Sequence, residues 1–267
     1  MAKIRTRVCP ECGETYDVYL HRCPHCHASN DERPNTRMTF LPSPRQVSLF
    51  LVGLLGIEFI SVLFSILFTT VYKEDQAYGY LLINTFTYIT LFIIMVFILA
   101  KYFNEIFIPF KKGRTYLAGL IGGTALIGCS MLVSLIMSVI VPDAGTGENQ
   151  SIAVAMILNN PLVCYLILGL IGPFVEECAY RLGLFSLNRR LSRVLAYLLT
   201  VLIFTVIHLD FFSDDILSEL VALPDYLIAA TIFCVLYEYE GFGAGFIAHA
   251  INNIFSVSMV LLQARLG

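Results

Sequence analysis

Long apolar runs separated by short polar connections make up most of the chain after residue 46. The runs cover about 47–72, 78–103, 116–141, 161–187, 191–209, 224–237 and 242–262. A helix needs roughly 20 apolar residues to cross the hydrocarbon core of a bilayer. The pattern therefore predicts an all-α polytopic membrane protein. We expect seven transmembrane helices, or eight if residues 151–158 or 211–223 also enter the membrane.

The first 46 residues are polar and basic instead, and they contain a cluster of four cysteines. Cys9-Pro-Glu-Cys12 and Cys23-Pro-His-Cys26 are two Cys-x-x-Cys motifs separated by ten residues. Four thiolates at this spacing can close a tetrahedral zinc site. A head this small cannot bury enough core to fold without such a metal. The pattern resembles the zinc-ribbon modules of microbial proteins.

We therefore predict a zinc-ribbon over residues 1–29, a linker over 30–46 and a membrane domain over 47–267. The zinc is expected to be structural, and the ribbon to dock an unidentified cytoplasmic partner. His21, His25 or His27 is an alternative to one of the thiolates, and a redox pair or a disulfide is an alternative to the metal. The remaining cysteines, Cys129, Cys164, Cys178 and Cys234, lie in apolar runs and are interpreted as small buried hydrophobes.

Composition and charge agree with a membrane protein. The chain is 57% hydrophobic and only 14% charged, with a mean hydropathy of +0.76, and no basic surface for nucleic acid is visible. Its first residues lack the apolar run of a cleaved signal peptide. Lys and Arg gather before the first span and in alternate connections, whereas the other connections contain only Lys73. Because basic loops stay in the cytoplasm, we expect a multi-pass protein of the cell membrane with a cytoplasmic N-terminus.

The run at 161–187 contains Glu176-Glu177-x-x-x-Arg181. Ionisable side chains are costly inside a membrane, so they usually face a protein interior and have a function. Glu177 and Arg181 are four residues apart, so on a helix they can pair on one face. Glu176 is rotated by about 100° from Glu177 and is left to move protons.

Two further polar clusters follow. His208 lies four residues after Phe204, and Asn253 lies four residues after His249. Together with Glu176 these residues supply a base, a partner imidazole and two donors for an oxyanion, which is the equipment for adding water to a peptide carbonyl. Taken singly, each has a structural interpretation: a buried histidine, an ion pair that fixes packing, or an asparagine that joins helices.

The ordered motifs resemble those of the CAAX-protease and bacteriocin-processing (CPBP or Abi) family of intramembrane proteases, which is related to the type II CAAX prenyl endopeptidases. The resemblance covers about residues 161–262, and Leu182 stands where a glycine often follows the arginine. It implies that Glu176 activates water with His208, that His249 and Asn253 bind the oxyanion, and that Glu177 and Arg181 hold the helix. In a metalloprotease version, which we do not favour, Glu176, His208 and His249 would bind a catalytic metal.

The resemblance thus predicts an endopeptidase that cuts a membrane-associated protein or peptide. Candidate substrates are a prenylated C-terminal peptide, a bacteriocin leader or a membrane-anchored regulator. The alternative is a non-catalytic scaffold, sensor or immunity-type protein with the same fold.

The sequence does not decide the depth of His208 or the role of Glu58. His208 lies about 25 Å along its predicted span, far from the depth of Glu176. Either that span begins later, with residues 189–193 on an interfacial helix, or the preceding span is broken at Gly172-Pro173. Glu58 lies in the middle of the first span. It either lines a cavity or is a neutral, hydrogen-bonded acid.

Overall fold

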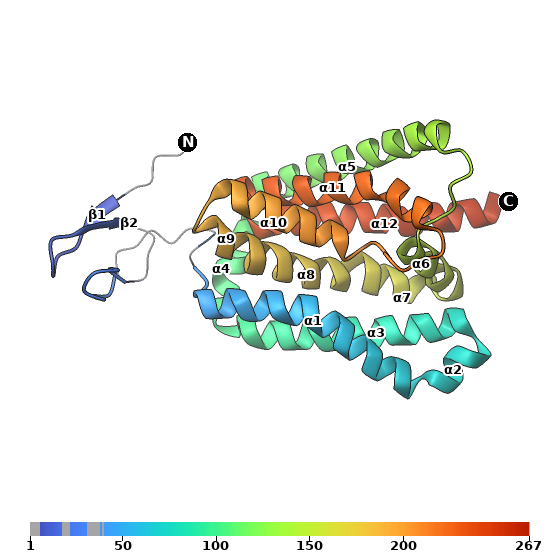
Figure 1. Ribbon diagram of the computed structural model, residues 1–267, viewed down its shortest axis with the longest axis horizontal. Helices are drawn as coiled ribbons and strands as arrows, with labels where there is room; N and C mark the ends of the chain where they lie inside the picture. The colour runs from blue at the N-terminus through green and yellow to red at the C-terminus, as the bar shows by residue number, and fades with distance from the viewer. Residues whose placement is uncertain (1–5, 18–21, 31–37, 39, 267) are drawn as a thin grey trace.

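The computed structural model describes residues 6–17, 22–30, 38 and 40–266. Two short strands, β1 (Thr6–Val8) and β2 (Thr15–Asp17), pair antiparallel in the N-terminal head. Nearly everything after residue 42 is helical, and Figure 1 shows the helices running side by side along one axis with the head beyond one end of the bundle. The structure therefore confirms the predicted all-α membrane protein with a small N-terminal cysteine module.

Six helices are long and apolar enough to cross a bilayer. They are α1 (Ser43–Leu67), α3 (Gln76–Leu99, extended by short turns to Lys111), α5 (Gly113–Ile140), the helix Pro161–Arg189, α11 (Ile216–Glu240) and α12 (Phe242–Leu266). The predicted fifth span is α10 (Arg193–Val206), which is apolar but only 14 residues long. The expected seven helices are thus present, one of them shorter than a full span.

Short helical elements connect or continue the long ones. They are α2 (Thr69–Glu74), η1 (Ala100–Tyr102), α4 (Phe103–Phe107), η2 (Pro109–Lys111), α6 (Glu148–Asn159), α7 (Pro161–Leu166), η3 (Ile167–Ile171), α8 (Gly172–Glu177), η4 (Cys178–Phe185) and α9 (Ser186–Arg189). Residues 151–158, considered as an eighth span, lie in α6.

Two helix boundaries differ from the sequence pattern. The first helix begins at Ser43, inside the expected linker, and α11 begins at Ile216 rather than at Pro224. The side chain of Asp215 accepts the amide hydrogen of Ser218 and so caps α11. The sequence pattern places the start too late because Ser218 and Glu219 interrupt the apolar residues before Pro224, and a proline often marks the start of a helix, although it can also be accommodated inside one.

The helix from Pro161 to Arg189, made of α7, η3, α8, η4 and α9, is the most deeply buried span. Figure 1 shows it between the pair α1 and α3 and the group α5, α10, α11 and α12. It approaches α1 closely at two glycines. A Cβ atom on Gly53 would lie 2.2 Å from the Cβ of Ala179, and one on Gly183 would lie 2.9 Å from the backbone nitrogen of Phe50. Small residues permit this close backbone approach, as is common in membranes.

Helix order divides the bundle into two ends, which we name the ribbon end and the opposite end. At the ribbon end α1, α5, α10 and α12 begin, next to the head (Figure 1). At the opposite end lie α2, α6, the connection 207–215 and the C-terminus. Basic residues favour the ribbon end, which has Arg45, Lys101, Lys111, Lys112, Arg114, Arg189, Arg190 and Arg193, whereas the opposite end has Lys73 and Arg265.

Candidate active site and metal centre

The four head cysteines lie together. Their sulfur atoms are all within 4.8 Å of one another, with 3.5 Å between Cys9 and Cys26 and 3.7 Å between Cys12 and Cys23. A tetrahedral zinc site with bonds of about 2.3 Å has sulfur atoms about 3.8 Å apart, so the four thiols fit this ion. The backbone N–H of Cys12 lowers the pKa of Cys9 to about 7, whereas the pKa values of Cys12 and Cys26 are raised, so a bound cation is needed to hold all four groups as thiolates.

Each Cys-x-x-Cys motif forms the same tight turn. The amide of Gly13 donates to the carbonyl of Cys9, and the amide of His27 donates to the carbonyl of Cys23. The backbone of both donor residues is in the left-handed region, with φ of +77° at Gly13 and +60° at His27. His27 thus occupies a position that favours glycine. His25 and His27 do not belong to the sulfur cluster, and His21 lies outside the described residues.

In the membrane, α8 carries the two adjacent acids between two stretches of π-helix, η3 and η4. Wide turns of this kind occur often at functional sites. Here the amide of Gly172 donates to the carbonyl of Ile167, five residues back. The next carbonyl, that of Leu168, would need the amide of Pro173, which has no hydrogen. The helix therefore continues through Pro173 without the break considered above, and one carbonyl is left without a backbone donor.

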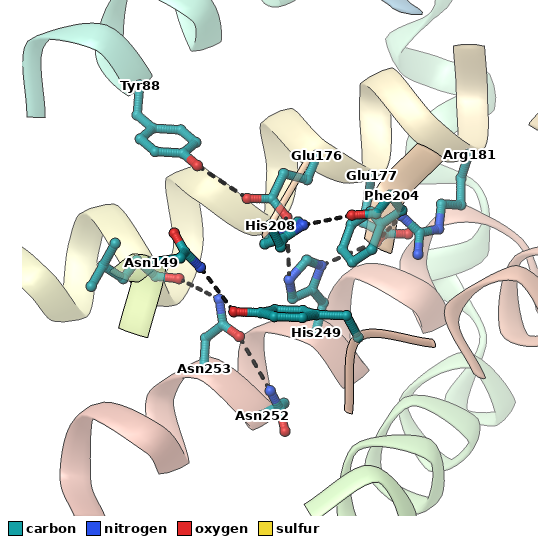
Figure 2. Close-up of polar contacts among 12 residues, drawn as sticks. Tyr88, Asn149, Glu176, Glu177, Arg181, Phe204, His208, His249, Asn252 and Asn253 are labelled. Carbon is teal, nitrogen blue, oxygen red and sulfur yellow. Dashed lines mark hydrogen bonds and ion pairs between the residues drawn. The ribbon is translucent and has the colours of Figure 1, made fainter. Parts of the chain in front are cut away.

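Asn253 on α12 supplies that donor. Its Nδ2 donates to the carbonyl of Leu168 at 2.9 Å, and its side-chain oxygen accepts from Asn252 at 3.3 Å (Figure 2). This residue thus has a structural partner within α7–α9, which the sequence did not predict.

Glu177 faces the closed side of the helix. Its side chain is fully buried, 3.3 Å from Nη1 of Arg181 and 3.1 Å from Nδ1 of His249. The Arg181 guanidinium is fully buried too, and lies 4.7 Å from the ring centre of Phe204 and 5.1 Å from that of Phe233. Aromatic faces attract a cation, so the rings share its stabilisation with the carboxylate.

Glu176 faces the other way and meets groups from three other helices. Its Oε1 accepts from the hydroxyl of Tyr88 on α3 at 3.2 Å. Its Oε2 lies 3.8 Å from Nε2 of His208, just after α10, and 3.6 Å from Nε2 of His249 on α12. Figure 2 shows these side chains around the Glu176 carboxylate. The structure therefore brings Glu176, His208 and His249 together, while Asn253 is hydrogen-bonded elsewhere.

Hydrogen bonds fix the tautomer of both histidines. Nδ1 of His208 lies 2.6 Å from the carbonyl of Phe204, which can only accept, so this nitrogen carries a proton. Nδ1 of His249 faces the Glu177 carboxylate in the same way. In the neutral rings, Nε2 of each histidine is therefore an acceptor, as is Oε2 of Glu176. Three acceptors around one position suit a water molecule, whose hydrogens can reach two of them at separations too long for direct hydrogen bonds.

The same three groups were considered as metal ligands. Among the described residues, the head cysteines form the only group of three or more such ligand atoms that all lie within 4.8 Å of one another. Glu176 is close to both histidines, so the long separation is between the two imidazole nitrogens. Two nitrogens bound to one zinc at about 2.1 Å can be no more than about 4.2 Å apart. In this arrangement, the three residues do not fit a shared metal ion.

The earlier conflict over the depth of His208 is resolved by the local geometry. The fifth span begins at Arg193, after the cap at Ser192, and ends at Val206, two residues before His208. The preceding helix continues for 13 residues from Glu176 to Arg189, and the 14 residues of α10 then run back from the same connection, so His208 lies at a depth similar to that of Glu176. Sequence hydropathy could not show the end of α10 because Ile207 and Leu209 continue the apolar run past Val206.

A cavity of about 860 Å³ reaches the carboxylate of Glu176. It is lined by residues of α1, α2, α3, α6, α8 and the end of α10, and Glu176, His208 and Glu58 are among them. Glu58 therefore lines the cavity, the first of the two interpretations above. Glu176 is therefore open to this space, whereas the side chain of Glu177 is fully buried.

Several residues of the site lacked a sequence signal. Tyr88 lies on a span with no motif, and Tyr226 packs its ring 4.7 Å from that of His208 while accepting from Asn149 at 3.0 Å. Tyr180 lines the cavity one helical turn after Glu176, and its hydroxyl has no hydrogen-bond partner among the described residues. Only Tyr180 was within reach of sequence reasoning, through its spacing of four from Glu176.

Comparison with known proteins supports the motif interpretation. Residues 158–255 match the family of type II CAAX prenyl endopeptidase Rce1-like proteins. No curated protein and no solved structure is significantly similar to the chain. The matched region contains Glu176, Glu177, Arg181, His208, His249 and Asn253, and excludes the head and the first three spans. Residues 158–255 of this multi-pass membrane protein are thus similar to the Rce1-like type II CAAX prenyl endopeptidases.

Proposed function

We propose that this chain is an intramembrane endopeptidase in which Glu176 activates water to hydrolyse a peptide bond of a membrane-associated protein or peptide. The observation that carries the proposal is the position of Glu176 Oε2, within 3.8 Å of Nε2 of both His208 and His249 and at the wall of a cavity. The Tyr88 hydroxyl occupies Oε1 and leaves Oε2 to act as the base.

In the proposed reaction, water lies between Glu176 Oε2 and His208 Nε2. Glu176 takes one proton as the water oxygen bonds to the carbonyl carbon, and His208 accepts a hydrogen bond from the remaining hydroxyl. The peptide C–N bond then breaks, and Glu176 returns its proton to the leaving amine. General base catalysis of this kind contributes about 10²- to 10⁴-fold.

His249 is proposed to stabilise the oxyanion. It can donate from Nε2 only when both of its nitrogens are protonated, and the Glu177 carboxylate holds its Nδ1 at 3.1 Å. Asn253 uses one amide hydrogen on Leu168 and has a second for the substrate. Glu177 and Arg181 position His249 and the helix, without touching the substrate.

The ligand separations support the glutamate mechanism over the metalloprotease one. We further propose that the head binds one structural zinc through Cys9, Cys12, Cys23 and Cys26. The excess of basic residues at the ribbon end supports a cytoplasmic ribbon in the cell membrane, where it would be available to a cytoplasmic partner.

Three single variants of the purified full chain test the activity: Glu176→Gln, His208→Ala and His249→Ala. Each is expected to lower cleavage of membrane-associated test peptides by at least about 10²-fold, as loss of a general base or oxyanion donor does. Elution from a sizing column and thermal unfolding in detergent check that the fold is kept. If all three variants cleave like the wild type, the protein does not use this site, and the scaffold interpretation takes its place.

A further inference from the structure

The cavity beside Glu176 has a polar lining that the proposed chemistry does not use. Four polar residues face it at spacings of three or four: Glu58, Ser61 and Ser65 of α1, and Thr69 at the start of α2. On α3, Tyr80, Asn84, Thr87 and Tyr88 do the same. Apart from polar residues near their N-termini and from Thr85 and Thr90, both helices are apolar, so packing with each other or with lipid does not require these two polar rows.

An extended peptide bound in the cavity would need polar side chains of this kind. Inside a bilayer, every backbone N–H and C=O must find a polar partner, and a strand away from a sheet has none of its own. This row extends from Glu58 on α1 to Thr69 at the start of α2, about 16 Å at the helical rise, which about five extended residues would match. The row ends beside exposed Thr69 and Lys73, so the cavity opens at the opposite end.

Glu58 is the charged member of this lining. Its carboxylate makes no hydrogen bond or ion pair with the part of the chain that the structure describes, and it is exposed to the cavity. The other charged groups of the lining are Glu176 and, at the mouth, Lys73. An unpaired carboxylate at membrane depth is a functional residue by default, and its natural partner is a cation.

The residues around the mouth of the cavity also carry mostly negative charge, like Glu58. The only described cations at the opposite end are Lys73 and Arg265. Its acidic residues are Glu74, Asp75, Asp143, Glu148, Asp210, Asp214, Asp215 and Glu219. The hydroxyl and amide of Ser218 hold the pKa of Asp215 below its usual value, so it stays charged. A negative rim around a cavity raises the local concentration of cationic ligands and repels anionic ones.

We propose that the cavity binds an extended peptide segment with a Lys or Arg side chain at Glu58, and that the segment enters from the opposite end. This inference rests on the proposed function, because it names the substrate class of the same site. A segment that ends in a free carboxylate close to the cleaved bond is disfavoured, since two of the three charged side chains of the lining are acids.

Binding of dye-labelled peptides to the full chain in detergent tests the inference without requiring cleavage. The probes are acetylated, amidated peptides of Leu, Ala and Ser that differ only in a central Lys, Gln or Glu, and a Lys peptide with a free carboxylate. We expect the amidated Lys peptide to bind the wild type most tightly. Glu58→Gln is expected to weaken its binding about tenfold, the loss of one charge-assisted hydrogen bond. Glu58→Lys is expected to favour the Glu peptide.

Glu74→Gln is the matched control, because it removes the same charge on α2 from a residue that does not line the cavity. Thr69→Trp narrows the mouth and is expected to weaken binding of every peptide alike. Equal binding of the Lys and Gln peptides to the wild type, or a Lys preference that survives Glu58→Gln, would overturn the inference.

Cleavage of the same peptides, followed by mass spectrometry, separates this inference from the proposed function. If cleavage depends on Glu176 but not on the central charge of the peptide, the endopeptidase proposal is supported and the proposed preference for a cationic segment is wrong. If binding prefers the Lys peptide because of Glu58 but no probe is cleaved, the peptide-binding cavity is supported and the endopeptidase proposal is not.

Discussion

The ribbon and the membrane site both gather polar side chains, but they gather them in different ways. In the ribbon, four sulfur atoms lie within 4.8 Å of one another, and all come from two short turns close in sequence. In the membrane, Glu176, His208 and His249 come from three separate helices, and their contacts to Glu176 are 3.6 and 3.8 Å long. The first arrangement fits a closed metal site, and the second leaves room for a water molecule and opens to a cavity.

The comparison teaches that burial alone does not define either site. Glu177 is the more buried of the two adjacent acids, yet its carboxylate is already paired with Arg181 and His249. Glu176 keeps one oxygen at the cavity, because Tyr88 takes only the other. Neighbouring residues on one helix thus have opposite surroundings, one closed by an arginine and a histidine and the other open to the cavity.

The largest expected effect concerns metal content. A variant with all four head cysteines changed to serine is expected to lose its bound zinc entirely, whereas the wild type binds one zinc per chain, as measured by elemental mass spectrometry. Because the proposed reaction needs no metal, the variant is expected to keep its cleavage activity in detergent. If a zinc ion remains in the variant and its removal abolishes activity, the membrane site also binds a metal, and the contrast between the two sites is wrong.

A smaller effect separates the two acids. Arg181→Ala leaves Glu177 buried without its cation and is expected to lower the free energy of unfolding by about 3–5 kcal/mol. Glu176→Gln removes no ion pair with arginine or lysine and is expected to abolish activity with little change in stability. Denaturant titration in mixed micelles measures both, with Arg114→Ala as a control because that side chain is largely exposed. Equal destabilisation by Arg181→Ala and Glu176→Gln would contradict the division of roles.

The smallest effect concerns the hydroxyl of Tyr88. Tyr88→Phe removes the 3.2 Å hydrogen bond to Glu176 Oε1 and leaves the ring in place. A hydrogen bond of this kind contributes about 0.5–1.5 kcal/mol, so kcat is expected to fall about two- to tenfold while KM stays nearly constant. Tyr116→Phe, on the exposed face of α5, is the control. An unchanged kcat would mean that Tyr88 does not orient the base.

Much of this protein follows from its sequence alone. The spacing of four cysteines specifies a local site, because the two turns need no distant contact to form. Apolar runs specify the spans, because a bilayer imposes a minimum helix length on them. The spacing of four between Glu177 and Arg181 places them on one face of a helix, since the helical period is fixed.

Only the tertiary structure decided how the membrane site is completed. The depth of His208 depends on where α10 begins, and Asn253 is drawn to Leu168 because Pro173 leaves that carbonyl without a donor. The cavity at Glu58 is formed between residues of α1, α3 and α8 beside the Glu176 carboxylate. A sequence records which side chains share a helix face, whereas contacts between helices depend on packing over the whole bundle.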